Sequence, residues 1–417
     1  MEKLFRATLL SLALIGTYAY AEPSYLEATY GISAEEAQLR LGLQEQVIAL
    51  SEKLNTENDP NYADMYIQHT PVYKIVILFS DNKNRHQFLK SLDPKLQRYV
   101  QLKNVKKSRS QYEQELNELG KLIQTLGIPY TAKFDLEKQR YEVTVENKDD
   151  FNAIKQEAKK LSFKNDIHLE IGSLPVSQSA PTGVQKGDKV FGGNKITLQP
   201  NNTGGYCTIG YAVNYKVGAI AKQGILTAGH CSKSINIDIN GRNIAFSNPI
   251  VWYSSKEGRY GDGKNDKYDY AVFDATGLAL TNEVKYKNTN GIPEFAKPAG
   301  TFKVTKTLGF MNQKKGMIVC KSGQTTGITC GEITNGNYTR NGASGWIEVK
   351  NSKQPNVSAG GDSGGPWFLY PGKATTITAV GIHSAGDEPS ANVEDFAIYM
   401  PIDYIDDHNS SISLILK

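Results

Sequence analysis

The chain has 417 residues, 39% of them hydrophobic, which is enough for two or three domains that each bury a core. Its 47 basic and 43 acidic residues leave a formal net charge of +4. Such a balanced charge gives no reason to expect binding to nucleic acid or to an acidic membrane surface.

The first 21 residues are predicted to be a signal peptide. Lys3 and Arg6 precede an apolar run from Ala7 to Ile15, and Ala19-Tyr20-Ala21 has the small-x-small pattern of a cleavage site. The apolar run is too short for a good membrane span, and no later run is long enough to cross a bilayer. We therefore expect the protein to be secreted and soluble.

The region from residue 22 to about 185 is predicted to alternate helices with strands. It lacks cysteine, has few glycines, and is rich in Lys, Glu, Gln and Leu. Periodicity and end signals predict helices over 33–53, 110–126 and 149–161, with Asp149 or Asp150 as the cap of the third. Strands are predicted over 72–79, over 140–145, and over a last segment ending near 171.

Residues 175–189 are rich in Ser, Gln, Pro, Gly and Thr and predict a linker. Beyond them, short β-branched runs alternate with turn pairs such as Asn240-Gly241 and Asn290-Gly291. This pattern predicts an all-β sandwich or barrel in two halves. The predicted organisation is a signal peptide at 1–21, an α+β region at 22–185 and an all-β domain at 186–417.

All four cysteines lie in the predicted all-β domain. Four cysteines in an exported chain suggest two disulfides and allow three connectivities. Cys207 and Cys231 bracket a histidine motif, and Cys320 and Cys330 close a short loop. The pairing 207–231 with 320–330 is therefore the natural one.

Three motifs carry the chemistry of this sequence. In the run 360–367, GGDSGGPW, glycines on both sides of Ser363 allow a tight turn that exposes the hydroxyl to converging backbone N–H groups. A serine hydroxyl needs a general base and a group that orients this base. His230, in the run 226–231, and Asp269, at the head of the strand-like run 268–273, supply these two groups.

Asp266 is a competing carboxylate close to Asp269 in the sequence. It falls in Gly263-Lys264-Asn265-Asp266, which also reads as a turn. Asp269 alternates with Ala271 and Phe273 and so lies on the inward face of a strand. Asp269 is the preferred candidate for this reason.

The order His, Asp, Ser in these contexts resembles the chymotrypsin-like serine proteases. Val319–Gly331 and Val190–Gly193 look like the corresponding segments of the alpha-lytic protease and streptogrisin group of secreted bacterial proteases. The resemblance implies two antiparallel six-stranded β-barrels with the active site between them. It also implies that residues 22–185 are a pro-region that serves as folding chaperone and inhibitor, and that the enzyme is a monomer without a cofactor.

The same resemblance assigns roles to individual residues. His230 is the expected general base, Asp269 its orienting carboxylate and Ser363 the nucleophile, with the backbone N–H groups of Gly361 and Ser363 as the oxyanion hole. In this group a basic side chain, usually arginine, pairs with the aspartate before the nucleophile. Here Lys321 is expected to pair with Asp362, without the bidentate geometry of arginine.

The S1 pocket is predicted from the segment 357–360 and from the strand 376–384 with the residues after it. No aspartate stands where trypsin-like members select Arg or Lys. His383 and Ser358 resemble residues with which glutamyl endopeptidases bind a P1 carboxylate, and Ser384 and Gly386 complete the predicted pocket.

Several features depart from the glutamyl endopeptidases. Gly386 replaces a serine of those enzymes, Trp367 and Tyr399 replace two supporting histidines, and the loop 387–395 is acidic. The alternative is that His383 is a core histidine in an enzyme with a broad or apolar P1 preference.

The remaining histidines lack the spacing of a metal site, and no zinc or calcium motif is present, so no metal is predicted. They are His69, His86, His168 and His408. His408, beside Asp406 and Asp407, is predicted to lie in a solvated turn.

These motifs predict a secreted serine endopeptidase that acts on proteins or peptides, is made as a proenzyme, and prefers Glu at P1. A second hypothesis is a protease-like binding protein without activity. For residues 22–185 the alternative is an adhesion or targeting domain. The last strand of that region contains Glu170-Ile171, where an enzyme of this specificity could begin its own processing.

Overall fold

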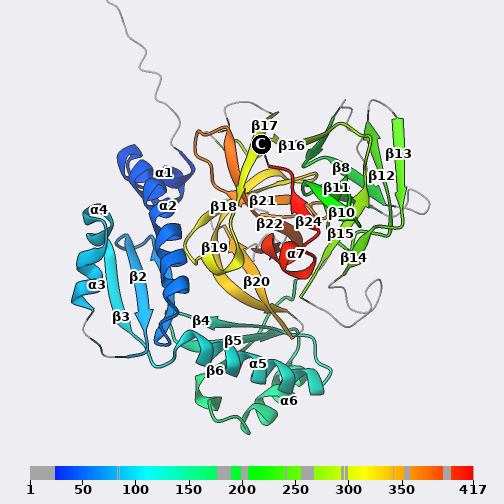
Figure 1. The fold of residues 1–417 in the computed structure, drawn as a ribbon. Coiled ribbons are helices and arrows are strands. Elements are labelled where there is room, and N and C mark those ends of the chain that lie inside the picture. The colour runs from blue at the N-terminus through cyan, green and yellow to red at the C-terminus, as the bar shows by residue number, and fades with distance from the viewer. Residues whose placement is uncertain are drawn as a thin grey trace, which may run out of the picture.

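The computed structural model describes most of the chain beyond residue 23, and the arrangement of its elements is shown in Figure 1. The described residues are 24–81, 83, 85–175, 189–198, 205–239, 242–254, 267–292, 295, 299–340, 342–351, 357–387 and 396–416. The predicted signal peptide and most of the predicted linker lie outside them, as does Asp266. Among the described residues, no helix is both long and apolar enough to span a membrane.

The N-terminal region forms two lobes. The first lobe contains the short helix α1 and the long helix α2, and its sheet has the order β1-β2-β3. Its elements are α1 (Tyr25–Tyr30), α2 (Ala34–Glu57), β1 (Tyr62–Gln68), β2 (Lys74–Phe79), α3 (His86–Ser91), α4 (Pro94–Gln97) and β3 (Val100–Asn104).

The second lobe repeats the order helix, two strands, helix, strand. In both lobes the first two strands are antiparallel and the third is parallel to the second. The elements of the second lobe are α5 (Arg109–Thr125), β4 (Thr131–Asp135), β5 (Arg140–Val145), α6 (Lys148–Ala158), the 3₁₀ turn η1 (Lys164–Asp166) and β6 (Ile167–Ile171). No internal repeat was evident in the sequence.

Most of the predicted elements of this region are present within a few residues of their expected ends. The N-cap of α6 was wrong, because Asn147 accepts the N–H groups of Asp149 and Asp150 and so caps the helix itself. Six helices and strands were not predicted, namely α1, β1, α3, α4, β3 and β4. Their short or partly exposed runs lack a clear period.

The last six-strand unit of the chain closes into an antiparallel barrel. Going around it, the strand order is β19-β18-β21-β22-β23-β20, and β20 pairs back with β19. The strands are β18 (Ile318–Gly323), β19 (Gly327–Arg340), β20 (Ala343–Lys350), β21 (Pro366–Leu369), β22 (Thr376–Gly386) and β23 (Phe396–Pro401). Its sheet is extended through β17 (Ala299–Thr307), β16 (Leu280–Lys287) and β7 (Val190–Gly192).

The preceding half of the β-rich domain consists of a five-stranded and a four-stranded sheet. They have the orders β14-β15-β11-β10-β24 and β13-β12-β8-β9. The strands are β8 (Lys195–Leu198), β9 (Tyr206–Thr208), β10 (Ala212–Val217), β11 (Ile220–Thr227), β12 (Ser234–Ile239), β13 (Arg242–Ser247), β14 (Val251–Tyr253), β15 (Tyr270–Asp274) and β24 (Ile412–Leu414).

One hydrophobic core joins these two sheets. Ile196 and Ile235 of the four-stranded sheet pack in the same cluster as Ile225 and Phe273 of the five-stranded sheet. The pairing of the described residues thus gives two packed sheets where the resemblance predicted a second closed barrel. The helix α7 (Asp403–His408) leads to β24, which returns the end of the chain to this half.

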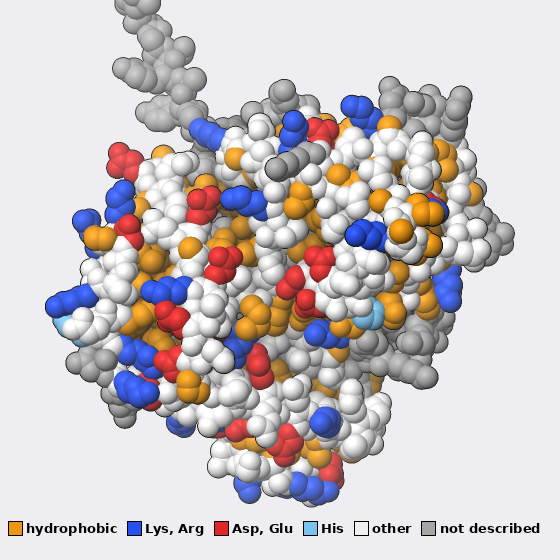
Figure 2. Space-filling view, viewed as in Figure 1, with side chains coloured by type: hydrophobic (Ala, Val, Ile, Leu, Met, Phe, Trp, Pro, Cys, Tyr) orange, Lys and Arg blue, Asp and Glu red, His pale blue; other side chains and the backbone are white. Residues whose placement is uncertain are grey.

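The N-terminal region lies against the closed barrel (Figure 1). Strand β4 pairs with the end of β19, with Thr131 opposite Arg340 and Ala132 opposite Thr339, so the sheet of the second lobe continues that of the barrel. In the first lobe the N–H of Ile67, on β1, donates to the carbonyl of Lys315. On the face in Figure 2, positive and negative side chains are interspersed.

Candidate active site

Ser363 lies on a tight turn whose shape depends on glycine. Gly361 and Gly364 have φ values of +96° and +84°, a region that side chains with a Cβ rarely adopt. A Cβ on Gly364 would also lie 2.2 Å from Thr227 Oγ1. These glycines bring Ser363 against the end of β11, and Ser363 is fully buried.

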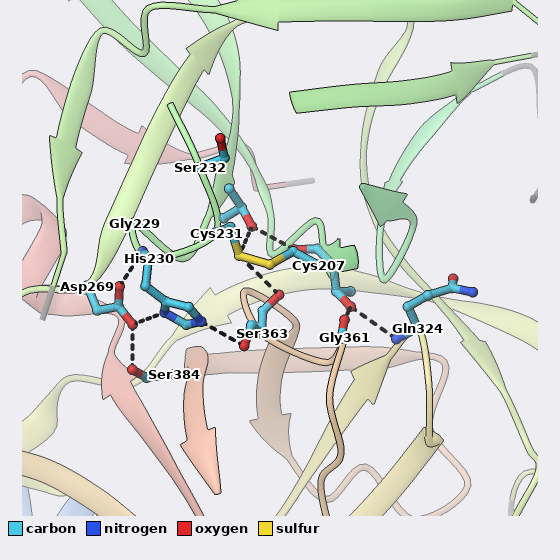
Figure 3. The surroundings of a disulfide bond; sticks show 12 residues. Cys207, Gly229, His230, Cys231, Ser232, Asp269, Gln324, Gly361, Ser363 and Ser384 are labelled. Carbon is cyan, nitrogen blue, oxygen red and sulfur yellow. Dashed lines mark hydrogen bonds and ion pairs between the residues drawn. A yellow bond between two sulfur atoms is a disulfide. The ribbon is translucent and has the colours of Figure 1, made fainter. Parts of the chain in front are cut away.

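His230, Asp269 and Ser363 form a continuous hydrogen-bonded chain (Figure 3). His230 Nδ1 lies 2.7 Å from Asp269 Oδ2, and His230 Nε2 lies 2.8 Å from Ser363 Oγ. Because a carboxylate can only accept, Nδ1 carries the proton and Nε2 accepts the Ser363 hydroxyl. This tautomer is the one that a general base for Ser363 requires.

Local pairing explains why residues so far apart in the sequence meet. Thr227 at the end of β11 is opposite Ala271 on β15, which places His230 beside Asp269, the residue before β15. The N–H of His230 also donates to Asp269 Oδ1 at 2.9 Å. Gly229 is required here because a Cβ would lie 1.6 Å from the carbonyl oxygen of Tyr253.

The carboxylate of Asp269 is held ionised although it is fully buried. Burial alone would raise the pKa of Asp269, but His230 and the hydroxyl of Ser384 stabilise the charge and keep the pKa below its ordinary value. The hydroxyl of Ser384 donates to Asp269 Oδ2 (Figure 3). The hydroxyl of Ser384, a residue predicted to line the pocket, is therefore engaged by Asp269.

The peptide groups around Ser363 are oriented by hydrogen bonds to neighbouring loops. The carbonyl of Gly360 accepts from Thr325 Oγ1, and the carbonyl of Asp362 accepts from the N–H of Gly365. The C=O and N–H of a trans peptide point in opposite directions. The N–H groups of Gly361 and Ser363 therefore point away from Thr325 and Gly365 respectively.

Lys321 and Asp362 form a fully buried ion pair beneath the turn. Lys321 Nζ lies 2.6 Å from Asp362 Oδ2, as expected from the sequence, and donates to Thr326 Oγ1 as well. The other carboxylate oxygen accepts the N–H groups of Thr325 and Thr326. Burial would raise the pKa of Asp362, but Lys321 and these donors keep it lowered.

His383 and Ser358 are buried polar residues near the turn. His383 exchanges backbone hydrogen bonds with Gly364 and Gly365, so β22 runs beside Ser363. Neither His383 Nε2 nor Ser358 Oγ has a hydrogen-bond partner among the described residues. A Cβ on Gly386 would lie 2.1 Å from Ser358 Oγ, which places this hydroxyl against the end of β22.

Trp367 was noted in the sequence only as a departure from related enzymes, but it contacts His383 directly. Its indole Nε1 donates to His383 Nδ1 at 3.4 Å, and its ring stacks on that of Tyr399 with centroids 5.0 Å apart. Tyr399 in turn donates to Gln313 Oε1. Only the position of Trp367 immediately after GGDSGGP could have suggested this role.

The structure contains both expected disulfides, Cys207–Cys231 and Cys320–Cys330. The first joins β9 to the segment with His230, as Figure 3 shows. The second links β18 to β19 next to Lys321. In the described part of the chain, no group of His, Cys, Asp or Glu side chains could hold a metal ion.

Comparison with known proteins identifies the class of this domain. Residues 212–407 match the family model described as Trypsin. Together with the closed antiparallel barrel and the preceding β-sheets, this makes the C-terminal part a trypsin-like serine protease domain with a mostly β fold, preceded by an α+β region.

Similar solved structures include three proteases. Thermobifida fusca protease A is 22% identical over 55% of this chain and 100% of its own, with a TM-score of 0.36. Cellulomonas bogoriensis chymotrypsin is 24% identical over 55% and 100%, with a TM-score of 0.35. A glutamic acid specific serine protease, described as using a histidine triad in substrate binding, is 21% identical over 54% and 100%, with a TM-score of 0.36.

Proposed function

We propose that the protein is a secreted serine endopeptidase made as a proenzyme. The observation that carries this proposal is the unbroken chain from Ser363 Oγ through His230 to Asp269, in the tautomer that general-base catalysis needs. An inactive binding protein would have no requirement for this alignment. The Trypsin family match over residues 212–407 supports the same class of reaction.

In the proposed reaction Ser363 Oγ attacks the carbonyl carbon of the scissile bond while His230 Nε2 takes the hydroxyl proton. Asp269 stabilises the resulting imidazolium, which gives the proton to the leaving amine as the C–N bond breaks. The N–H groups of Gly361 and Ser363 stabilise the oxyanion. Water then attacks the acyl-enzyme with the same base, which releases the carboxylic acid and restores Ser363.

Glu is the proposed P1 residue because two buried donors beside the turn lack partners. His383 Nε2 and the Ser358 hydroxyl could both bind a side-chain oxygen of the substrate. Leaving two such groups unpaired costs free energy, so a substrate that pairs them gains binding. The alternative, a broad or apolar P1 preference, requires that both groups stay unpaired in the Michaelis complex.

The N-terminal region is proposed to act as folding chaperone and inhibitor of the domain that follows. Its support is the extent of the contact: β4 extends the barrel sheet at β19, and polar contacts join both lobes to the barrel. An unrelated adhesion domain would not need to share a sheet with the protease. Two disulfides and the predicted signal peptide favour export.

The proposed first processing site at Glu170-Ile171 is exposed to solvent, but it lies within a paired strand at the edge of its sheet. Both residues belong to β6, where Glu170 is opposite Thr144 and Ile171 opposite Val145 on β5. A scissile bond must enter the cleft as a single extended strand, so β6 would first have to leave its sheet. We therefore propose that processing begins after residue 175, in the predicted linker.

The test is a P1 profile of the matured enzyme on peptides that differ only at P1, with Glu, Asp, Leu, Phe and Lys. Ser363→Ala should lower kcat by about a millionfold and abolish labelling by a phosphonylating serine reagent. Activity that survives Ser363→Ala would overturn the proposed mechanism. Preference for Leu or Phe, with Ser363 still essential, would support the proposed serine protease mechanism and reject the proposed specificity for Glu at P1.

For the N-terminal region, the precursor and a chain starting at residue 187 should be refolded under identical conditions. The chaperone proposal predicts that only the precursor, or the shorter chain supplied with residues 22–180, recovers active enzyme at an appreciable rate. Equal recovery with and without residues 22–180 would contradict it.

A further inference from the structure

The contact between Trp367 and His383 fixes which nitrogen of His383 carries its proton. An indole N–H can donate a hydrogen bond but cannot accept one. Since Trp367 Nε1 points at His383 Nδ1 at 3.4 Å, Nδ1 must be the unprotonated nitrogen. The proton of the neutral ring is therefore on Nε2, the atom that has no partner among the described residues.

A second proton on His383 would be strongly disfavoured. It would have to bind Nδ1, where it would face the N–H of Trp367. Burial is the main cause, and the ammonium of Lys321 the second, that lowers the pKa of His383 to about 3. The other charged or titratable groups that act on the ring are Asp362, His230 and Asp269.

The surroundings of His383 supply no net positive charge. Lys321 is paired with Asp362 at 2.6 Å, and the stacked ring of Tyr399 behind Trp367 is uncharged, since burial raises the pKa of Tyr399 well above its ordinary value. The two groups available to a substrate, His383 Nε2–H and the Ser358 hydroxyl, are thus neutral donors. Neutral donors satisfy an amide oxygen as well as a carboxylate oxygen.

We infer that Trp367 locks His383 as a neutral Nε2–H donor, so that the site selects a P1 side chain with a terminal oxygen acceptor and cleaves after glutamine as well as after glutamate. This inference rests on the proposed function of Ser363 and on His383 facing P1. The reason is the cost of desolvation: a buried carboxylate needs a compensating positive charge, whereas a carboxamide does not. A charged imidazolium would have favoured glutamate alone.

An apolar P1 side chain is excluded by the same argument. Methionine has nearly the shape and length of glutamine but presents only a thioether sulfur, a weak acceptor. It would leave both donors unpaired in a closed site. Sites built to bind a polar group reject analogues that lack it far more strongly than apolar pockets reject an extra methylene.

The experiment compares four peptides, identical except for Gln, Glu, Met or Leu at P1, on the matured native enzyme. Active-site titration of Ser363 normalises every rate. The expected kcat/KM values for Gln and Glu lie within about tenfold of each other, and both exceed that for Met by about a hundredfold or more. A Glu preference over Gln of about a hundredfold or more would overturn the inference.

Trp367→Phe tests the role of the indole directly, because it keeps an aromatic ring and removes the N–H. Freed from this donor, the ring is no longer fixed as the Nε2–H tautomer, so the ratio of Gln to Met cleavage should fall by about fivefold to tenfold. A Gln-to-Met ratio equal to that of the native enzyme would contradict the inference.

Two further variants keep the test decisive. Trp346→Phe removes a buried indole N–H that has no partner among the described residues and should leave the ratio unchanged. His383→Gln replaces the ring with a neutral donor that cannot be protonated, so cleavage after Gln and Glu should remain comparable at every pH. His383→Gln replaces Trp367→Phe as the test if the Trp367→Phe variant fails to fold.

Failure of this inference can be told apart from failure of the proposed function. If no peptide is cleaved and Ser363 is not labelled, the protease proposal itself is wrong. If Ser363 is labelled and Met or Leu is preferred, the proposed P1 acceptor is wrong, and the inference falls with it. If Glu alone is cleaved rapidly, the Glu proposal stands and the neutral-donor inference is overturned.

Discussion

Lys314 of the protease domain and Asp64 of the N-terminal region form a buried ion pair, with Nζ and Oδ1 2.7 Å apart and side-chain exposures of 3% and 13%. The hydroxyl of Tyr112 donates to the other carboxylate oxygen at 3.2 Å. This pair joins the first lobe to the segment between β17 and β18. It is one of the contacts between the N-terminal region and the C-terminal domain.

Asp64→Asn should weaken the docking of the N-terminal region by about 3–5 kcal/mol, because it leaves the Lys314 ammonium buried without its countercharge. The measurement is thermal unfolding of the full chain carrying Ser363→Ala, which prevents self-cleavage. Asp64→Asn with Lys314→Met should recover part of the loss. Lys222→Gln, at a more exposed pair with Asp274, should change stability by less than about 1 kcal/mol.

His69 should make the same interface sensitive to acid. Its ring is buried against the barrel, with Nε2 2.7 Å from the carbonyl oxygen of Gly316, and burial lowers the pKa of His69 to about 4. The facing groups are Arg40, Tyr30 and Tyr73. The docked state favours the neutral ring, so docking is unaffected above pH about 6.5 and weakens as pH falls toward 4, by about 3 kcal/mol in all.

The measurement is the pH dependence of stability of the Ser363→Ala precursor with and without His69→Gln, which keeps an amide donor for Gly316. The variant should remove this loss between pH 6.5 and 4, whereas His168→Gln on the exposed β6 should retain it. Glu332 works in the opposite direction, since burial raises its pKa and its protonated form favours docking. A loss of equal size in both variants would rule out His69 as its source.

The sequence predicted the fold class of the β-rich domain and which of its short motifs lie close together. His230, Asp269 and Ser363 lie in short motifs whose local backbone determines the geometry, as the glycines at 229, 361 and 364 show by having no room for a Cβ. The Lys321–Asp362 pair could be expected because each residue is fixed within such a motif. The sheet order of the first half depends on pairings between distant segments, which no local pattern encodes.

The roles of Ser384 and Trp367 could not be read from the sequence for a related reason. Which way the Ser384 hydroxyl turns depends on the carboxylate of Asp269, 115 residues earlier. Trp367 and His383 meet because β21 and β22 pair with Trp367 opposite Gly381, a register that the sequence does not reveal. Strand β4 was missed because one of its two partners, β19, belongs to the other domain.

Lys321→Met should abolish activity and destabilise the protease domain by about 3–5 kcal/mol, because Asp362 would keep a buried charge without its partner. The turn that carries Ser363 depends on Asp362, whose carboxylate also accepts the N–H of Ala359. The measurements are thermal unfolding and active-site titration. Lys321→Arg should retain more titratable sites than Lys321→Met; equal loss in both would show that the charge is not what matters.

His408 is not in the solvated turn that the sequence predicted. Its ring stacks on Tyr268 at 4.1 Å and 7° and meets the edge of Tyr253 at 4.1 Å. Its Nδ1 is hydrogen-bonded to the hydroxyl of Tyr270, 2.9 Å away. Tyr268 and Tyr270 flank Asp269, and in an extended segment their side chains lie on the face opposite to the carboxylate. The end of α7 therefore packs against the face of this segment that is opposite to the Asp269 carboxylate.

Removing the ring with His408→Ala should lower kcat by about tenfold with little change in KM, because a less firmly held Asp269 orients His230 less well in the transition state. His408→Phe keeps the stacking and loses only the hydrogen bond, as does Tyr270→Phe from the other side, so these two variants should agree and retain most of kcat. A lower stability of His408→Ala with kcat unchanged would mean that His408 merely packs.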